Sequence, residues 1–423
     1  MPRSDCSAAG SNSLYNDAVN HTTAAFLILC TTALQAEDWP QFRGPGGEGH
    51  STERALPAQW SETRNVLWKT PVAGRGWSSP VIVAGRVWLT TATDRRGDAS
   101  LRLLAFDAAT GKEVVNVEVL SLRDADLKNA KNSHASPTPI VEGDRVYVHF
   151  GATGTAALTT EGRIVWKVTL PYDSQHGNGG SPALYRDLLI VNCDGSDDAY
   201  VVALDKNTGR VRWKTQRRLP YDQSYSTPLV ISVDGRDQLV SVGAHRTMAY
   251  DPLTGKEIWR VSYGDGFSNV PRPVYSHGLV FIGTGVQEPS MMAVRPTGTG
   301  DVTKTHVAYT IERGAPFTPS PIVVGDEFYM VSDIGIANCL DVATGKTIWQ
   351  ARMPGNYSAS PVFADGKIYF LSEEGVATVL TPGKEFRKLA ENRVDGATFA
   401  SMGVSQGSLF IRSDTHLYRI GSR

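Results

Sequence analysis

Several kinds of functional site are missing from this chain of 423 residues. It holds only four cysteines, and just two of them, Cys193 and Cys339, follow residue 36. There is no C-x-x-C-H motif to attach a haem covalently, and no cysteine or histidine spacing typical of a zinc site. No Ser-His-Asp arrangement, phosphate-binding loop or pair of catalytic carboxylates can be argued from the motifs. We therefore assign no catalytic residue and no metal ligand.

An excess of charge and a membrane-spanning stretch are also lacking. The formal net charge is −1, which provides no electrostatic basis for binding nucleic acid or an anionic membrane. The apolar stretch AAFLILCTTAL at 24–34 is too short to span a bilayer. We therefore expect no nucleic-acid partner and no transmembrane segment in the mature chain.

The same apolar stretch fits the central region of a signal peptide, with Ala36 as a cleavage point. We interpret residues 1–36 as a signal peptide and predict export to the periplasm or cell envelope. The leader is unusual in having one arginine and two aspartates, so a true start after Met1 is an alternative. Cys30 follows Leu29, which is large for the residue before a lipidated cysteine, and lipidation is not expected.

The sequence shows no helical periodicity of hydrophobic residues, but it contains a repeated motif. Trp166, Trp213 and Trp259 lie 47 and 46 residues apart, and Trp349 follows after two further periods. Four segments read almost as copies: AFDAATGKEVV at 105–115, ALDKNTGRVRW at 203–213, AYDPLTGKEIW at 249–259 and CLDVATGKTIW at 339–349. A unit that recurs about every 45 residues is typical of a repeat architecture.

A second repeat runs in phase with the first, a proline followed by a β-rich run. It begins seven units, at Pro80, Pro137, Pro182, Pro228, Pro273, Pro321 and Pro361, and Met402 takes the proline position in an eighth. Proline suits the first residue of a strand, and a glycine-containing turn then makes a hairpin. The Asp and Gly of A-x-D-x-x-T-G favour a turn before a fourth strand. Eight such units predict an all-β fold, a single eight-bladed β-propeller of four-stranded antiparallel blades. A β-sandwich array is the alternative.

The ends of the repeat set the expected boundaries. The eighth unit stops at Ile420 without a fourth strand of its own, and NVLWK at 65–69 looks like that strand. We predict that it closes the ring, with residues 64–70 completing the last blade of a propeller that spans 64–423. Residues 37–63 are rich in Gly and Pro and are expected to wrap the outside as an extended lead-in. Cys193 and Cys339 then lie on separate blades, too far apart for a disulfide, and are predicted to be buried free thiols.

The A-x-D-x-x-T-G-x-x-x-W repeat resembles the tryptophan-docking motif of the quinoprotein-like propellers, which carry repeats like those that bind pyrroloquinoline quinone. The likeness covers about residues 60–423, and WPQFRGP at 39–45 looks like the lead-in of secreted bacterial members. The resemblance implies that one tryptophan of a unit packs on the neighbouring blade. The residues in that position are Trp68, Trp166, Trp213, Trp259 and Trp349.

The family that this chain resembles divides by function. Its quinoprotein alcohol and sugar dehydrogenases hold pyrroloquinoline quinone and Ca²⁺ in the funnel, whereas propellers such as the outer-membrane assembly factor BamB are non-catalytic. This chain is shorter than the dehydrogenases, has no adjacent cysteine pair and offers no convincing Glu/Asn/Asp set for Ca²⁺. It also lacks the lipidation site of the assembly factor. It is most similar to secreted non-catalytic members related to BamB, so we expect no cofactor, with pyrroloquinoline quinone and Ca²⁺ as the alternative.

The residues just before each innermost strand should meet at one mouth of the central channel. They mix aromatic rings with polar side chains, which could stack on a flat ligand or sugar and hydrogen-bond its edge. The alternative is that they are ordinary turn and channel-filling residues. The candidates are Trp77, His134, His176, Asn178, Tyr225, Asn269, Arg272, Phe317, Asn356 and Tyr357. CDGSDD at 193–198 could also bind Ca²⁺ through oxygen ligands, although a solvated acidic turn is the simpler interpretation.

We therefore expect an exported, non-enzymatic binding or scaffold propeller with a protein or polysaccharide partner. The alternatives are an alcohol or sugar oxidoreductase dependent on pyrroloquinoline quinone, and a cofactor-free sugar-binding propeller. No feature of the sequence specifies an oligomeric state.

Overall fold

The computed structural model describes residues 36–422, apart from 96, 124, 126–128, 218–222 and 288. Residues 1–35 of the expected signal peptide lie outside the described residues. The chain from Ala36 on forms one compact unit. In the described part it consists of strands joined by turns, with one short 3₁₀ helix, η1 (Gly151–Thr153). Among these residues no helix is long and apolar enough to cross a membrane.

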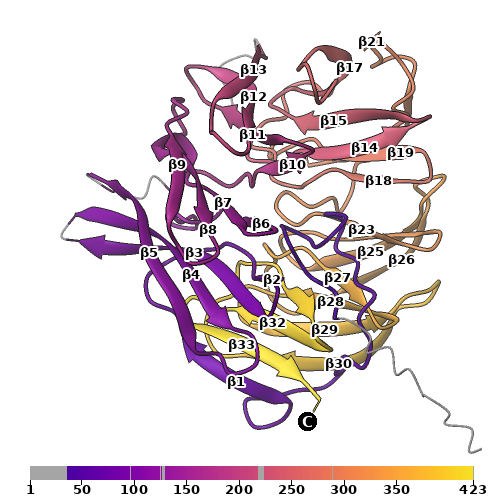
Figure 1. Ribbon diagram of the computed structural model, residues 1–423. Helices are drawn as coiled ribbons and strands as arrows, with labels where there is room; N and C mark the ends of the chain where they lie inside the picture. The colour runs from indigo at the N-terminus through magenta and orange to yellow at the C-terminus, as the bar shows by residue number, and fades with distance from the viewer. Residues whose placement is uncertain are drawn as a thin grey trace, which may run out of the picture. The chain divides into compact units, whose positions relative to one another are not determined.

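Eight sheets follow one another along the chain, and we call them blades 1 to 8 (Figure 1). Blade 1 contains β2 (Val81–Val83), β3 (Arg86–Arg95), β4 (Asp98–Asp107) and β5 (Glu113–Leu122). Blade 2 contains β6 (Ile140–Glu142), β7 (Arg145–His149), β8 (Thr155–Thr159) and β9 (Ile164–Val168). Blade 3 contains β10 (Ala183–Tyr185), β11 (Leu188–Asp194), β12 (Ala199–Asp205) and β13 (Val211–Gln216). Blade 4 contains β14 (Leu229–Val233), β15 (Arg236–Val242), β16 (Arg246–Tyr250) and β17 (Glu257–Ser262), with β21 (Gly300–Asp301) added at its edge.

The second half of the ring repeats this arrangement. Blade 5 contains β18 (Val274–Ser276), β19 (Leu279–Gly283), β20 (Met291–Val294) and β22 (Val307–Ile311). Blade 6 contains β23 (Ile322–Val324), β24 (Glu327–Val331), β25 (Ile336–Asp341) and β26 (Thr347–Arg352). Blade 7 contains β27 (Val362–Ala364), β28 (Lys367–Leu371), β29 (Val376–Thr381) and β30 (Arg387–Arg393). Blade 8 contains β31 (Gly403–Ser405), β32 (Ser408–Arg412), β33 (His416–Gly421) and β1 (Val66–Pro71).

The all-β, eight-bladed propeller predicted from the repeat is confirmed. The strand register corrects one detail of the repeat. β6 begins at Ile140, directly after Pro139, just as β2 follows Pro80. Pro137, which was expected to begin the second unit, lies two residues too early because the sequence SPTP contains two prolines.

The two ends of the described unit meet in blade 8. β1 pairs antiparallel with β33 as the outermost strand of that sheet, with Lys69 opposite Tyr418. Figure 1 shows β1 lying beside β33. The strand expected at 65–69 is thus present at 66–71.

Four of the five repeat tryptophans hydrogen-bond to the following blade. Each indole Nε1 donates to a backbone carbonyl in the turn of that blade, at 2.9 to 3.1 Å. The pairs are Trp68 with Ala108, Trp166 with Lys206, Trp213 with Pro252, and Trp349 with Gly383. The indole ring also covers the turn glycine where one follows, as Trp213 covers Gly255.

Blades 4 and 5 make this contact differently. Trp259 donates to the side chain of Gln238 at 2.7 Å, and Gln238 in turn donates to the carbonyl of Pro296 in blade 5 at 2.9 Å. Blade 5 has no tryptophan at the docking position, and Tyr309 replaces it. The Tyr309 hydroxyl donates to the carbonyl of Val342 in the turn of blade 6 at 2.5 Å.

Replacing Gly255 with alanine is expected to lower the free energy of unfolding by about 3 kcal/mol. Part of the loss comes from placing a side chain on a left-handed backbone, and part from the overpacked contact that the new Cβ atom would make. Gly255 has φ +70°, and a Cβ atom would lie 2.5 Å from the Trp213 ring. Gly235 is the matched control, since it has φ +75° and open space around it. Gly235→Ala should cost about 1 kcal/mol, the backbone part alone. Urea unfolding of both variants measures the difference, and equal losses would show that the indole contact is unimportant.

The lead-in does not wrap the outside of the ring, and that expectation was wrong. Residues 38–51 instead cross the innermost strands of several blades. Backbone hydrogen bonds join Trp39 to Ile82 in blade 1, Pro40 to Val141 in blade 2, and Ser51 to Phe363 in blade 7. The apolar side chains of the lead-in explain this path, because Trp39, Leu56 and Trp60 join the core between blades 7, 8 and 1.

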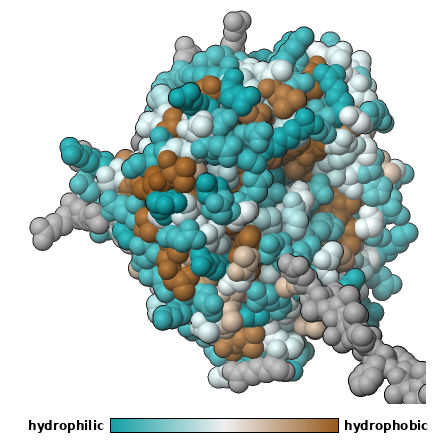
Figure 2. All heavy atoms as spheres, in the orientation of Figure 1, coloured by the Kyte–Doolittle hydropathy of each residue, from teal (hydrophilic) through white to brown (hydrophobic). Residues whose placement is uncertain are grey.

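Apolar side chains pack between neighbouring blades in separate clusters. Cys193 and Cys339 lie in two of these clusters as buried free thiols, as predicted. Figure 2 shows that the visible face is mainly polar and that the hydrophobic residues on it gather in separate patches.

Candidate functional site

A hollow walled by loops of the blades lies at the centre of the ring, on the side of the loops that precede the innermost strands. It has a volume of about 440 Å³, and all eight blades contribute to its wall. Seven ring side chains line it: Phe42, Trp77, His176, Tyr225, Phe267, Phe317 and Phe399. Phe42 comes from the lead-in, which therefore forms the floor of the cavity.

Four of the lining rings form two pairs that span neighbouring blades. Trp77 of blade 1 packs against Phe399 of blade 8, with ring centroids 4.6 Å apart and planes tilted by 41°. His176 of blade 3 packs against Tyr225 of blade 4 at 6.1 Å. The Arg75 guanidinium lies 5.3 Å from the centre of the Trp77 ring. These rings provide apolar faces on which a flat or apolar group can stack.

A belt of serine and threonine hydroxyls also surrounds the cavity. Each belongs to the residue just before an innermost strand proline, or before Met402 in blade 8. Backbone N–H groups of one blade donate to the hydroxyl oxygen of the next at 2.9 Å, from Ser79 to Thr138, Thr138 to Ser181, Ser181 to Thr227, Ser320 to Ser360 and Ser360 to Ser401. A hydroxyl that accepts one such bond still has a proton to donate. The belt therefore links the blades and offers donors to a group in the cavity.

Blade 5 interrupts the belt with an arginine. Arg272 donates its backbone N–H to the Ser320 hydroxyl at 2.9 Å, and its guanidinium donates to the carbonyl of Phe42 at 2.8 Å. Burial lowers the pKa of Arg272 to about 10, so it is still charged at neutral pH. The positive charge supports the floor of the cavity from beneath Phe42.

The insertion between blades 1 and 2 reaches across the cavity mouth. Lys131 forms an ion pair with Glu373 of blade 7, with Nζ and Oε1 2.6 Å apart. The carbonyl of Lys131 accepts a hydrogen bond from the Trp77 indole at 3.1 Å, and Asn132 donates to the carbonyl of His176 at 2.7 Å. The insertion thus holds a half-exposed cation at the rim and fixes two of the wall rings.

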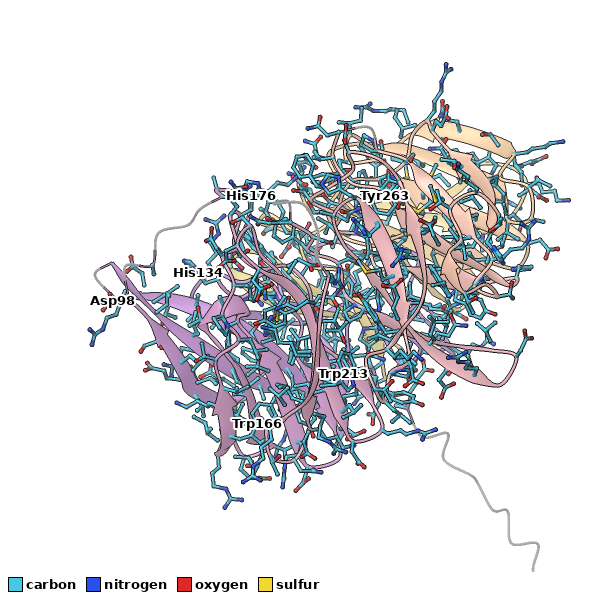
Figure 3. The ribbon with its side chains drawn as sticks, turned by 90° about the horizontal axis from the view of Figure 1, so that it is seen from above. Asp98, His134, Trp166, His176, Trp213 and Tyr263 are labelled. Atoms are coloured by element: carbon cyan, nitrogen blue, oxygen red, sulfur yellow. The ribbon has the colours of Figure 1, made fainter. Side chains whose placement is uncertain are left out.

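The structure brings together part of the predicted site. Trp77, His176, Tyr225 and Phe317 line the cavity. His134 and Asn178 line a smaller hollow of about 220 Å³ beside it, which shares His176 and Asn132 with the first. Figure 3 shows His134 and His176 at one end of the blades, with Trp166 and Trp213 away from them.

The other four predicted residues line neither hollow. Tyr357 is fully buried among core residues of blades 6 and 7, and Asn269 is fully buried and donates to the carbonyl of Gly283. Arg272 lies under the floor. Asn356 is exposed and donates to Glu374 at 3.3 Å. The prediction took residues from each loop, but successive side chains of an extended segment point to opposite sides, and sequence alone did not show which one faces the channel.

Sequence reasoning missed Phe42, Phe267, Lys131 and the hydroxyl belt. The belt had a visible signal, because Ser or Thr precedes the strand proline in six repeats and Ser401 precedes Met402. Phe42 had none, since its place depends on the path of the lead-in.

The residues of the cavity do not fit a quinone held by Ca²⁺. Ca²⁺ requires six to eight oxygen ligands, carboxylates among them, and the lining of the cavity contains no Asp or Glu. Among the described residues no group of three or more His, Cys, Asp or Glu side chains could hold a metal ion. In CDGSDD, Asp194 is fully buried in an ion pair with Arg217 at 3.0 Å, and Asp197 accepts the N–H groups of Asp173 and Asp198.

Comparison with known proteins decides the family. The family model described as outer membrane protein assembly factor BamB matches residues 51–177, 102–351 and 197–423, three overlapping stretches that together cover the propeller. The chain belongs to the BamB family.

Three known proteins are similar to this chain over most of their own length. BamB of Burkholderia pseudomallei (strain K96243) is 23% identical over 382 residues, which is 85% of this chain and 89% of that protein. The crystal structure of BamB from Moraxella catarrhalis matches with a TM-score of 0.60 at 16% identity, over 84% of this chain and 98% of that one. A quinohemoprotein alcohol dehydrogenase of Pseudomonas putida HK5 matches with a TM-score of 0.64 at 11% identity, over 91% of this chain and 80% of that one. At such low identities the two structures show a shared fold only.

Proposed function

We propose that the chain is exported to the cell envelope and acts there as a non-catalytic scaffold that binds a partner protein at the cavity mouth. The observation that carries the proposal is the cavity, whose wall has seven ring side chains and no carboxylate. Membership of the BamB family supports it, because the family model and the Burkholderia pseudomallei relative are described as outer membrane protein assembly factor BamB.

The chemistry of the cavity suits a segment of another polypeptide. An aromatic or aliphatic side chain of the partner would enter the apolar wall and lose its contact with water, and such buried anchors supply most of the free energy of many interfaces. The hydroxyl belt and Lys131 would donate to backbone carbonyls that enter with it. The cavity thus combines an apolar anchor site with donors at its rim and base.

Photo-crosslinking in the producing cell tests this proposal. With p-benzoylphenylalanine in place of Phe317, we expect an adduct with an envelope protein. With the same group in place of Val211, which is 54% exposed on the outer strand of blade 3, we expect none. Trp77→Ala should suppress the adduct because it removes half of the Trp77–Phe399 pair. An adduct that forms equally from both positions, or in the cytoplasmic fraction alone, would contradict the proposal.

An oligosaccharide is a second candidate ligand. The observation that favours it is the position of aromatic faces, above all Trp77, next to hydroxyl donors, since sugars stack on aromatic rings and accept hydrogen bonds.

Calorimetric titration separates the candidates. We expect no heat of binding with pyrroloquinoline quinone and Ca²⁺, because the cavity offers no carboxylate to the ion. Binding together with dye-linked alcohol oxidation would overturn the scaffold proposal. Heat with chito-oligosaccharides that disappears in Trp77→Ala would favour the sugar-binding candidate instead.

A further inference from the structure

The outer edge of blade 4 is covered by a piece of the chain itself. β21 pairs in parallel with β17, with Asp301 opposite Arg260. The N–H of the next residue, Val302, donates to the carbonyl of Arg260 at 2.9 Å. Val302 is 1% exposed and belongs to the same core cluster as Trp259, which is fully buried. The segment GDVT at 300–303 therefore shows which kind of strand this edge accepts.

The outer edge of blade 6 presents the same type of strand without such a cover. β26 carries Ile348 and Trp349 where β17 carries Ile258 and Trp259, in the same register with the preceding strand. In the described part of the chain, the sheet of blade 6 ends at β26. Trp349 is only half-buried. Its ring meets Phe386 edge-on at 5.2 Å, and Phe386 is 37% exposed.

The shared register also places the backbone groups of this edge. In blade 4 the carbonyl of Arg260 and the N–H of Ser262 face the added segment, and the latter donates to the Thr303 hydroxyl at 3.0 Å. Gln350 and Arg352 hold the equivalent positions in β26. Because residues of an antiparallel pair alternate between bonded and non-bonded positions, the backbone groups of Gln350 and Arg352 point outward, away from β25.

Charge at the edge of blade 6 favours an acidic segment. The exposed charged side chains around β26 and the turn that it docks on are mostly cations: Lys346, Arg352, Lys384 and Arg387, with Glu385 as the exposed acid among them. In blade 4 the covering strand brings Asp301 to Arg260. A partner segment with a carboxylate beside a small branched residue would place that carboxylate near the cations around β26 in the same way.

We propose that the outer edge of blade 6 is a docking site for an extended segment of a partner protein, which adds to β26 as a parallel strand. The segment would place a small β-branched residue over Trp349 and Phe386 and a carboxylate among the surrounding cations, as GDVT does at blade 4. Strand addition of this kind takes its affinity from backbone hydrogen bonds and its specificity from alternate side chains. The site is separate from the cavity and does not depend on the function proposed for it.

Disulfide trapping with a peptide from the chain itself tests this inference. The probe is TGTGDVTKTH, residues 297–306, with cysteine in place of Asp301. The protein is the full chain with Cys6→Ser and Cys30→Ser, in which Cys193 and Cys339 are fully buried. Gln350→Cys should be trapped about tenfold faster than the matched control Arg260→Cys, whose edge is already covered, a ratio equal to about 1.4 kcal/mol.

Competition with cysteine-free peptides identifies the recognised features. Excess TGTGDVTKTH should slow trapping at Gln350→Cys, whereas the same peptide with Asp in place of Val302 should not. Phe386→Ser should also slow it, because the apolar cover is lost. Equal trapping at both positions, or equal competition by the two peptides, would overturn the proposal.

Discussion

Removal of residues 60–70 is expected to abolish cooperative thermal unfolding and to cause aggregation. The deletion takes away all of β1 except Pro71, and β1 supplies the outer strand of blade 8 and pairs along its length with β33. The edge of β33 would then be left with unpaired backbone groups, which is the situation that promotes aggregation of sheet proteins.

The deletion also removes the contacts between blade 8 and blade 1. Trp68 donates to the carbonyl of Ala108 at 2.9 Å. Thr70 donates to the carbonyl of Gly111 at 2.9 Å. These contacts join the first and last blades, so their loss opens the ring between blades 8 and 1. We expect the remaining blades to be less stable, because each blade depends on the interfaces with its neighbours.

Near-UV circular dichroism and light scattering during heating measure this effect. Lys69→Ala is the control, because it keeps the strand and removes only partly exposed ion pairs with Glu62 and Asp395. Pairs of this kind contribute at most about 1 kcal/mol, so this variant should melt cooperatively. A deletion variant that melts like the unaltered chain would refute the view that β1 closes the ring.

Replacement of Arg43 with alanine is expected to lower the free energy of unfolding by about 3 to 4 kcal/mol, because it removes a buried, hydrogen-bonded charge. Arg43 lies in the lead-in and is 1% exposed. Its guanidinium donates to the carbonyls of Glu48 at 2.6 Å and of Pro321 in blade 6 at 2.7 Å. Burial, assisted by the neighbouring Arg272, lowers its pKa to about 9, so the side chain is charged at pH 7. The substitution leaves buried carbonyls without a donor and opens a void under the cavity floor.

Arg54→Ala is the matched control, since Arg54 belongs to the same lead-in and is exposed. It should change the free energy of unfolding by less than about 0.5 kcal/mol. Urea unfolding of the two variants compares them directly. If Arg43→Ala were as stable as Arg54→Ala, the lead-in would be a loosely held strap and not a structural floor of the cavity.

The repeat predicted the docking contacts better than it predicted the site. In three of the contacts a docking tryptophan and the carbonyl that receives it lie 39 or 40 residues apart, so one pattern specifies both partners there. Tyr309 and Gln238 show the limit, because each replaces a missing contact with a residue that no repeat pattern marks. The cavity residues share no such offset. Loops of different length place Trp77, Phe267 and Lys131 at the mouth, and the alternation of side chains along each loop decides whether a ring faces inward.

The sequence by itself determined the number of blades, their strand order and the turn that joins the last two strands of four blades. It could do so because each blade is built from contiguous residues, so that short-range pattern and strand pairing coincide. The tertiary structure alone decided the path of the lead-in and the composition of the cavity. Arg43 reaches Pro321, 278 residues away, and Lys131 reaches Glu373 across the ring. Contacts between segments so distant in the chain depend on the closed ring that brings them together, and no local pattern records them.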